Sequence, residues 1–158
     1  MLGLLLSLAL QFALYSLSIA LTFFHHGAYR HGKIICKVTT GPALLLVGRW
    51  AIALVWFYQG MWCKVLGRMP RHAEVVESAP MFTAGSAHLF LIALGWFETL
   101  LGISVVSGFG PQITALTEIA LLTVMNTAGL LWASKIIPDP VGMIFQNFAF
   151  AVLIWICR

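Results

Sequence analysis

The sequence predicts an all-α integral membrane protein, a compact bundle of transmembrane helices. Of its 158 residues, 61% are hydrophobic and 9% are charged, whereas soluble domains carry about 25% charged residues. The mean hydropathy is +0.96. The apolar runs are continuous and about twenty residues long, as membrane helices require. They lack the alternating hydrophobicity of the strands in an outer-membrane barrel.

We expect five spans, at residues 2–24, 44–66, 86–106, 113–134 and 141–157. Proline and glycine mark the breaks, with TTGP at 39–42, GFGP at 108–111 and PDP at 138–140, because these residues end or begin helices. The first run lacks a charged leading region and a cleavage site, so we interpret it as a retained helix. We therefore divide the chain into residues 1–42, the first helix with a basic and histidine-bearing loop, and residues 43–158, a four-helix membrane bundle.

Basic residues indicate the orientation of the chain in the bilayer. The loop from His25 to Gly41 carries Arg30, Lys33 and Lys37, and positive loops favour the cytoplasmic side. We expect an integral protein of a bacterial inner (cytoplasmic) membrane, with this loop in the cytoplasm and the lipid bilayer as its surroundings. No basic helix with interleaved aromatic residues is present, which argues against nucleic acid as a partner.

Polar residues within the apolar spans are the main functional signal. Glu98 lies inside the run ALGWFETLLGISVV, and a carboxylate in a span usually faces the bundle interior and meets a partner. A rise of about 1.5 Å per residue puts several polar side chains near the depth of this carboxylate. The sequence thus predicts a ligand or proton site formed by Gln59, Lys64, Glu98, Asn126 and Asn147.

Small residues share helix faces with the two charges. Gly60 lies one turn before Lys64, and Gly95 and Gly102 flank Glu98 at helical spacing. Small residues let membrane helices approach closely, and polar residues on the same face then bond across the interface. We therefore predict a buried charge pair between Lys64 and Glu98. The alternative is that the polar groups only hold the bundle together.

Two tryptophans, Trp62 and Trp96, lie close in sequence to the proposed site. Flat aromatic rings can stack on a quinone or a pigment, although packing is the ordinary role of such residues.

No metal site and no intrinsic cofactor is predicted. A haem between two spans needs two buried histidines at one depth, but His25, His26 and His31 lie on one side of the membrane, whereas His72 and His88 lie on the other. The run HHGAYRH lacks established ligand spacing for copper or zinc. The cysteines Cys36, Cys63 and Cys157 form no C-x-x-C pair.

The region 48–158 resembles the DoxX-like family of small four-helix membrane proteins. The segments that carry the resemblance are GRWAIALVWFYQGMWCKVL with Gly60 and Lys64 as G-x-x-x-K, LGWFETLLGISV with Glu98 and Gly102 as E-x-x-x-G, and PDPVGMIFQN with Asn147. The resemblance implies a four-helix core. The extra N-terminal helix and the histidine-bearing loop lie outside it. The resemblance also implies a redox context with quinone, because the family's named member is a small subunit of an archaeal thiosulfate:quinone oxidoreductase. The candidate ligands are therefore quinone or, for a span-lined site, lipid. The family's redox-active cysteines do not carry over, since Cys63 stands alone.

Three functions fit these observations. The first is an auxiliary subunit of a larger, quinone-linked membrane complex, with other membrane subunits as partners and no catalysis of its own. The second is a quinone-interacting oxidoreductase subunit in which Glu98, Lys64 and Gln59 bond a quinone carbonyl or relay its proton. The third is a small oligomeric transporter or channel. We favour the first, because the sequence contains no complete catalytic set and no cofactor motif.

Overall fold

The computed structural model describes residues 41–158, and within them four helices are long and apolar enough to cross a membrane. These spans are Pro42–Val65, Ala84–Ser107, Pro111–Trp132 and Pro140–Cys157. The prediction of an all-helical membrane bundle is confirmed. The predicted span at 2–24, the loop with His25, His26 and His31, and the residue Cys36 lie outside the described residues.

The first described span changes its helical form part-way along. Helix α2 (Pro42–Phe57) begins with a proline in its first turn, where the missing N–H is not needed. It continues directly into η1 (Tyr58–Val65), a π-helix. Gly67 follows at a φ of 62°, a left-handed conformation that glycine adopts without strain. The wider turns of η1 give the carbonyl and side-chain positions near Lys64 a different spacing from those of an α-helix.

Two helices follow before the turn at residues 108–110. The short α3 (Arg71–Glu77) lies between the predicted spans 44–66 and 86–106, where the sequence predicts no helix. Helix α4 (Ala84–Ser107) starts from a capping box in which the Thr83 and Ser86 side chains bond to each other's backbone N–H. It ends at Gly108, whose φ is 68°. A length of 24 residues corresponds to about 36 Å, enough to cross a bilayer.

The last two spans are α5 (Pro111–Trp132) and α6 (Pro140–Cys157), and each has proline in its first turn. The Asp139 side chain caps α6 by accepting a hydrogen bond of 2.9 Å from the Gly142 N–H. The breaks predicted from GFGP and PDP thus coincide with observed helix ends.

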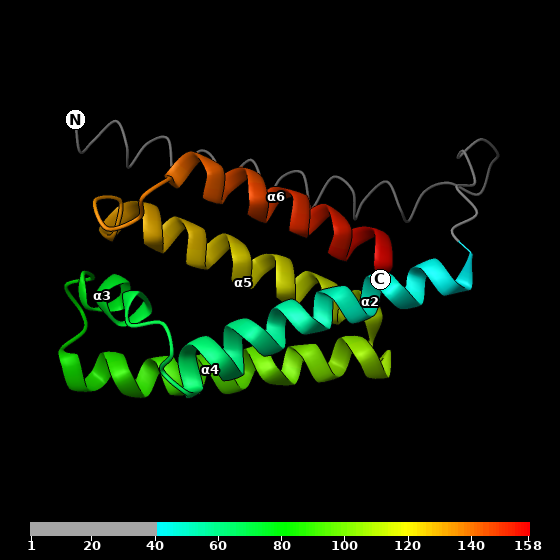
Figure 1. The fold of residues 1–158 in the computed structure, drawn as a ribbon, viewed down its shortest axis with the longest axis horizontal. Coiled ribbons are helices and arrows are strands. Elements are labelled where there is room, and N and C mark those ends of the chain that lie inside the picture. Colours follow the sequence, from blue (N-terminus) through cyan, green and yellow to red (C-terminus); the bar gives the residue numbers. More distant parts are fainter. Residues whose placement is uncertain (1–40) are drawn as a thin grey trace.

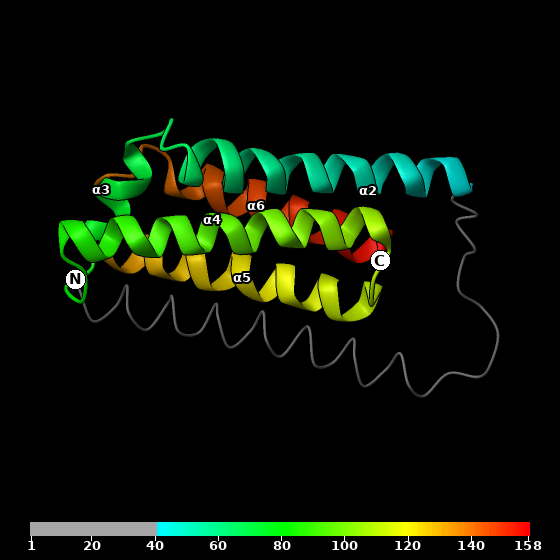
Figure 2. The same cartoon turned by 90° about the horizontal axis from the view of Figure 1, so that it is seen from below.

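Neighbouring helices run antiparallel (Figures 1 and 2). Helix α4 packs against α2 and η1, α5 packs against α6, and α6 also contacts α2. A buried apolar cluster lies between α2, α5 and α6. Its members are Ile52, Trp56, Ala115, Ile154 and Cys157. We call the end where α4 leads into α5 the Gly108 end of the bundle, and the opposite end carries α3 (Figure 1).

Candidate functional site

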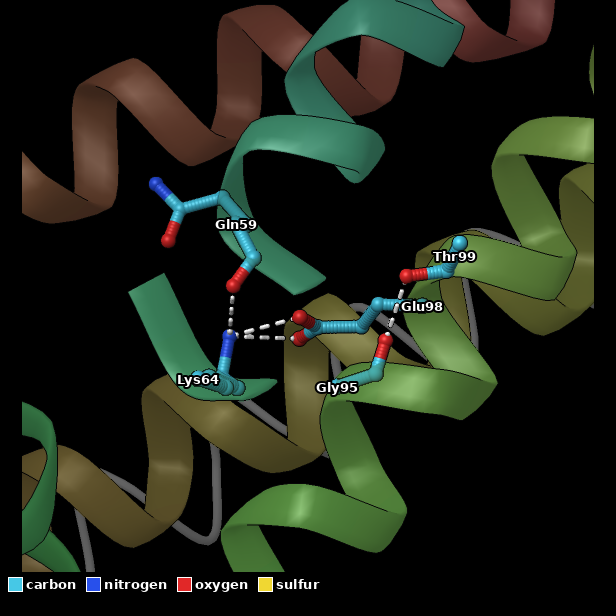
Figure 3. Close-up of polar contacts among 5 residues, drawn as sticks. All are labelled: Gln59, Lys64, Gly95, Glu98 and Thr99. Atoms are coloured by element: carbon cyan, nitrogen blue, oxygen red, sulfur yellow. Dashed lines mark hydrogen bonds and ion pairs between the residues drawn. The ribbon is translucent and has the colours of Figure 1, made fainter. Parts of the chain in front are cut away.

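Lys64 and Glu98 form a buried ion pair between η1 and α4. The Lys64 Nζ atom donates to both carboxylate oxygens of Glu98, at 2.8 Å to Oε1 and 2.6 Å to Oε2 (Figure 3). Each side chain is 1% exposed. The structure therefore contains the charge pair that the sequence predicts, and it shelters both charges from lipid inside the bundle.

The backbone of η1 completes the surroundings of the lysine. Lys64 Nζ also donates to the Gln59 carbonyl oxygen at 3.4 Å. An ammonium group has three N–H donors, and the two carboxylate oxygens and this carbonyl provide three acceptors. The Gln59 side-chain amide, which we expected in the site, points away from the ion pair (Figure 3). The residue thus contributes its backbone, because the π-helix brings the carbonyl of Gln59 towards the lysine five positions later.

Two glycines allow the helices to approach closely enough for this pair. A Cβ atom on Gly60 would lie 2.5 Å from the Gly95 carbonyl oxygen, and one on Gly95 would lie 2.7 Å from the Gly60 carbonyl oxygen. Both distances are too short for any side chain, so the backbones touch at this crossing. Contact between small residues is how membrane helices approach most closely, and it places Lys64 opposite Glu98.

A second polar contact joins the other two spans. The Asn147 Nδ2 atom donates to Asn126 Oδ1 at 2.6 Å, between α6 and α5. Among residues 41–158, no hydrogen bond or ion pair links these amides to Lys64 or Glu98. Hydrogen bonds among the described residues thus do not join the five predicted site residues into one network. These residues form two groups, because each set of polar side chains finds its partner on the helix packed directly against its own.

Comparison with known proteins assigns the chain to a family. It matches the DoxX-like family over residues 53–155. The protein belongs to the DoxX-like family. No curated protein and no solved structure matches the chain. The matched region includes both polar groups of this DoxX-like protein.

Trp62 and Trp96 belong to η1 and α4, the two helices that carry the ion pair. Their exposed fractions are 49% and 51%, so both rings lie on the outer surface of the DoxX-like bundle. Each tryptophan stands two positions from a member of the pair, and two positions correspond to about half a helical turn. The rings therefore point away from the charges, and Trp62 has the Arg68 guanidinium 5.7 Å from its ring centroid instead.

A further buried carboxylate was not among the predicted site residues. Glu118 on α5 is 2% exposed, and its Oε1 atom has no hydrogen-bond partner among the described residues. The buried indole of Trp56 interacts with this carboxylate, but no hydrogen bond of ordinary length joins their atoms. The sequence signal was present, because Glu118 is a second carboxylate inside an apolar span. It was not predicted as a site residue because it lies only about two turns from the start of the helix, away from the depth of Glu98.

Of the histidines in the described region, His72 lies outside the spans and His88 lies in the second turn of α4. His72 on α3 is half-buried, and burial together with the positive charge of Lys64 lowers its pKa from 6.5 to about 4. His88 is exposed. Within the described part of the chain, no three His, Cys, Asp or Glu side chains gather as metal ligands would.

Proposed function

We propose that this DoxX-like protein is an accessory subunit of a larger, quinone-linked membrane complex and performs no catalysis itself. The observation that carries the proposal is that Lys64 and Glu98 have all their hydrogen-bond partners within the chain and leave no free donor for a substrate. The three donors of the ammonium group face three acceptors of the same chain, and both side chains are 1% exposed. A substrate would have to separate this pair before either charge could act on it.

Separating the pair would be costly. Removing one partner of a buried ion pair costs about 3–5 kcal/mol, because the other charge remains buried without compensation. A site that exchanges substrate or protons repeatedly would not be expected to start from such a closed state. A fixed role fits better, in which the pair sets the alignment of η1 and α4.

The outer surface supports an accessory role as well. In each membrane-spanning window, between 11% and 33% of the residues are buried inside the chain. Large apolar side chains cover the remainder of the spans, among them Leu100, Phe145 and Phe148. The described helices bury so little of their own surface that broad faces remain for lipid, for the rest of the chain or for the helices of other subunits.

Native purification tests this proposal. After gentle detergent extraction, we expect the protein to elute with larger membrane subunits in a fixed ratio, measured by size-exclusion chromatography and mass spectrometry. Glu74→Gln serves as a control, since Glu74 is exposed on α3 and the variant should retain the association. A protein that elutes alone from the same extract would contradict the accessory role.

One observation favours a second candidate, a subunit that contacts quinone through Glu98 and Lys64. Lys64 belongs to a π-helix, and π-helical turns within α-helices are frequent at functional sites. Conversion of η1 to α-helical hydrogen bonding would rotate Lys64 and open the pair. In this case the purified protein should contain extractable quinone, and Glu98→Gln should lose it while Glu74→Gln keeps it. Extracts of the lone protein without quinone would rule this candidate out.

A further inference from the structure

A pocket at the Gly108 end of the bundle contains the unpartnered carboxylate. Its volume is about 20 Å³, and Glu118, Arg49 and Arg158 are among the residues that line it. A cavity needs roughly 10–15 Å³ to hold one water molecule, so the pocket accommodates one group of that size. Glu118 is 2% exposed, its Oε1 atom has no hydrogen bond of ordinary length, and the donor of the described residues that interacts with this carboxylate is the neutral Trp56 indole. A carboxylate has about four acceptor positions and an indole has a single neutral N–H, so most of this buried group stays without a donor. Leaving it so is costly, which indicates that a donor from outside the chain completes it.

Two guanidinium groups belong to the same pocket. Arg49 donates from Nε to the Cys157 carbonyl oxygen at 3.0 Å. A Cβ atom on Gly108 would lie 3.4 Å from Arg49 Nη1, so this side chain reaches from the end of α6 to the turn between α4 and α5. Arg158 is exposed, with its guanidinium carbon 3.3 Å from the Trp155 ring centroid. The pocket therefore combines a buried negative group with two positive groups at the end of the spans, the level of lipid headgroups.

We propose that this pocket binds the headgroup of a phospholipid with a primary ammonium group, namely phosphatidylethanolamine. The ammonium group donates to Glu118, and the phosphate accepts from Arg49 and Arg158. Guanidinium groups match phosphate oxygens through their paired donors. The binding site is independent of the accessory role proposed above, since it depends only on the chain's own residues and on the bilayer.

The size and chemistry of the pocket select among lipids. A primary ammonium is close to a water molecule in size and has three N–H donors. The trimethylated ammonium of phosphatidylcholine is larger and has no N–H donor, so it leaves Glu118 without a partner. Phosphatidylglycerol offers the phosphate but no cation for the carboxylate.

Native mass spectrometry of the full chain tests the proposal. The protein is exchanged into micelles that contain phosphatidylethanolamine, phosphatidylcholine and phosphatidylglycerol in equal amounts with identical acyl chains. We expect phosphatidylethanolamine to be retained about tenfold or more over either competitor, because a hydrogen bond to a charged group contributes that much to affinity. Glu118→Gln should remove the preference, whereas Glu74→Gln on the exposed face of α3 should keep it.

The controls make the outcome decisive. Circular dichroism checks that Glu118→Gln remains folded. If this variant does not fold, Arg158→Gln replaces it, since Arg158 is exposed and its loss should lower lipid retention with the fold intact. Equal retention of phosphatidylethanolamine and phosphatidylcholine would overturn the proposal, as would retention of phosphatidylglycerol at the same level. A folded Glu118→Gln protein that keeps the wild-type preference would overturn it too, as would an Arg158→Gln protein that retains as much lipid as the wild type.

Discussion

Lys64 and Glu98 are each 1% exposed, and their mutual contact is what makes a charge tolerable at this place in the bundle. A charged side chain at the centre of a membrane helix costs roughly 2.5–3.5 kcal/mol in insertion measurements. The pair avoids much of this cost because each charge has an opposite charge within hydrogen-bonding distance. Removal of either Lys64 or Glu98 alone should therefore lower the stability of the protein more than removal of both.

The first prediction concerns Glu98→Gln. The substitution leaves the Lys64 ammonium buried with a neutral partner, so we expect a loss of about 3–5 kcal/mol in the free energy of unfolding. The double variant Lys64→Met with Glu98→Leu has no buried charge and should regain most of this loss. Denaturation of the protein in mild detergent measures both effects. A Glu98→Gln protein as stable as the wild type would show that the ion pair does not hold the helices together.

The second prediction concerns pH and His72. Because the folded protein holds the pKa of His72 at about 4, below the 6.5 of the unfolded chain, the unfolded state binds more protons between these values. The contribution of His72 to stability is complete above pH 6.5 and declines as the pH falls towards 4. Stability measured over this range should decline less in His72→Gln than in the wild type. An equal decline in the two proteins would show that His72 does not contribute to the pH dependence.

At the scale of the helices, the crossing of η1 and α4 depends on two glycines whose backbones touch. We predict that Gly95→Ala is destabilising by about 1–3 kcal/mol, because its Cβ would lie 2.7 Å from the Gly60 carbonyl oxygen and forces the helices apart. Gly85→Ala in the same helix is the matched control, since its Cβ would meet nothing within 4 Å. The control should be neutral or slightly stabilising, as alanine favours helix. Equal stability of the two variants would contradict the close crossing.

The helix boundaries were predictable, and the local helical form was not. Prolines and glycines at 41–42, 108–111 and 138–140 placed the ends of the spans to within about two residues, because these residues act on the local backbone. The π-helical form of η1 left no mark in the hydrophobic pattern, since both helix types present an apolar surface to lipid. The short helix α3 was missed because it has few residues and no apolar stripe.

At the scale of the whole molecule, the bundle divides its polar contacts between two sets of helices. The ion pair joins η1 to α4, and the amide contact of Asn126 with Asn147 joins α5 to α6. The charge pair was predictable from glycine spacing around Lys64 and Glu98, which fixes both a helix face and a close approach. The amides were assigned to the same cluster by depth alone, and depth does not determine which helices are neighbours.

This division leads to a prediction of additivity. The double variant Lys64→Met with Glu98→Leu and the substitution Asn147→Leu should change the free energy of unfolding independently, and their sum should match the triple variant within about 0.5 kcal/mol. Asn147→Leu alone should cost about 0.6 kcal/mol, the typical value of a hydrogen bond between membrane helices. A coupling energy above about 1 kcal/mol would indicate that the two polar groups share a network after all.

The ion pair also bears on the order in which the chain enters the bilayer. Lys64 is made before Glu98 and stands one residue from the end of its span at Val65. Until α4 arrives, its flexible side chain can extend to the water at the membrane surface. Glu98 lies deep within α4, and its side chain cannot extend to water in this way. Lys64, however, has already been synthesised when Glu98 enters the membrane. The insertion machinery therefore does not have to release α4 into lipid before a counter-ion for Glu98 is present.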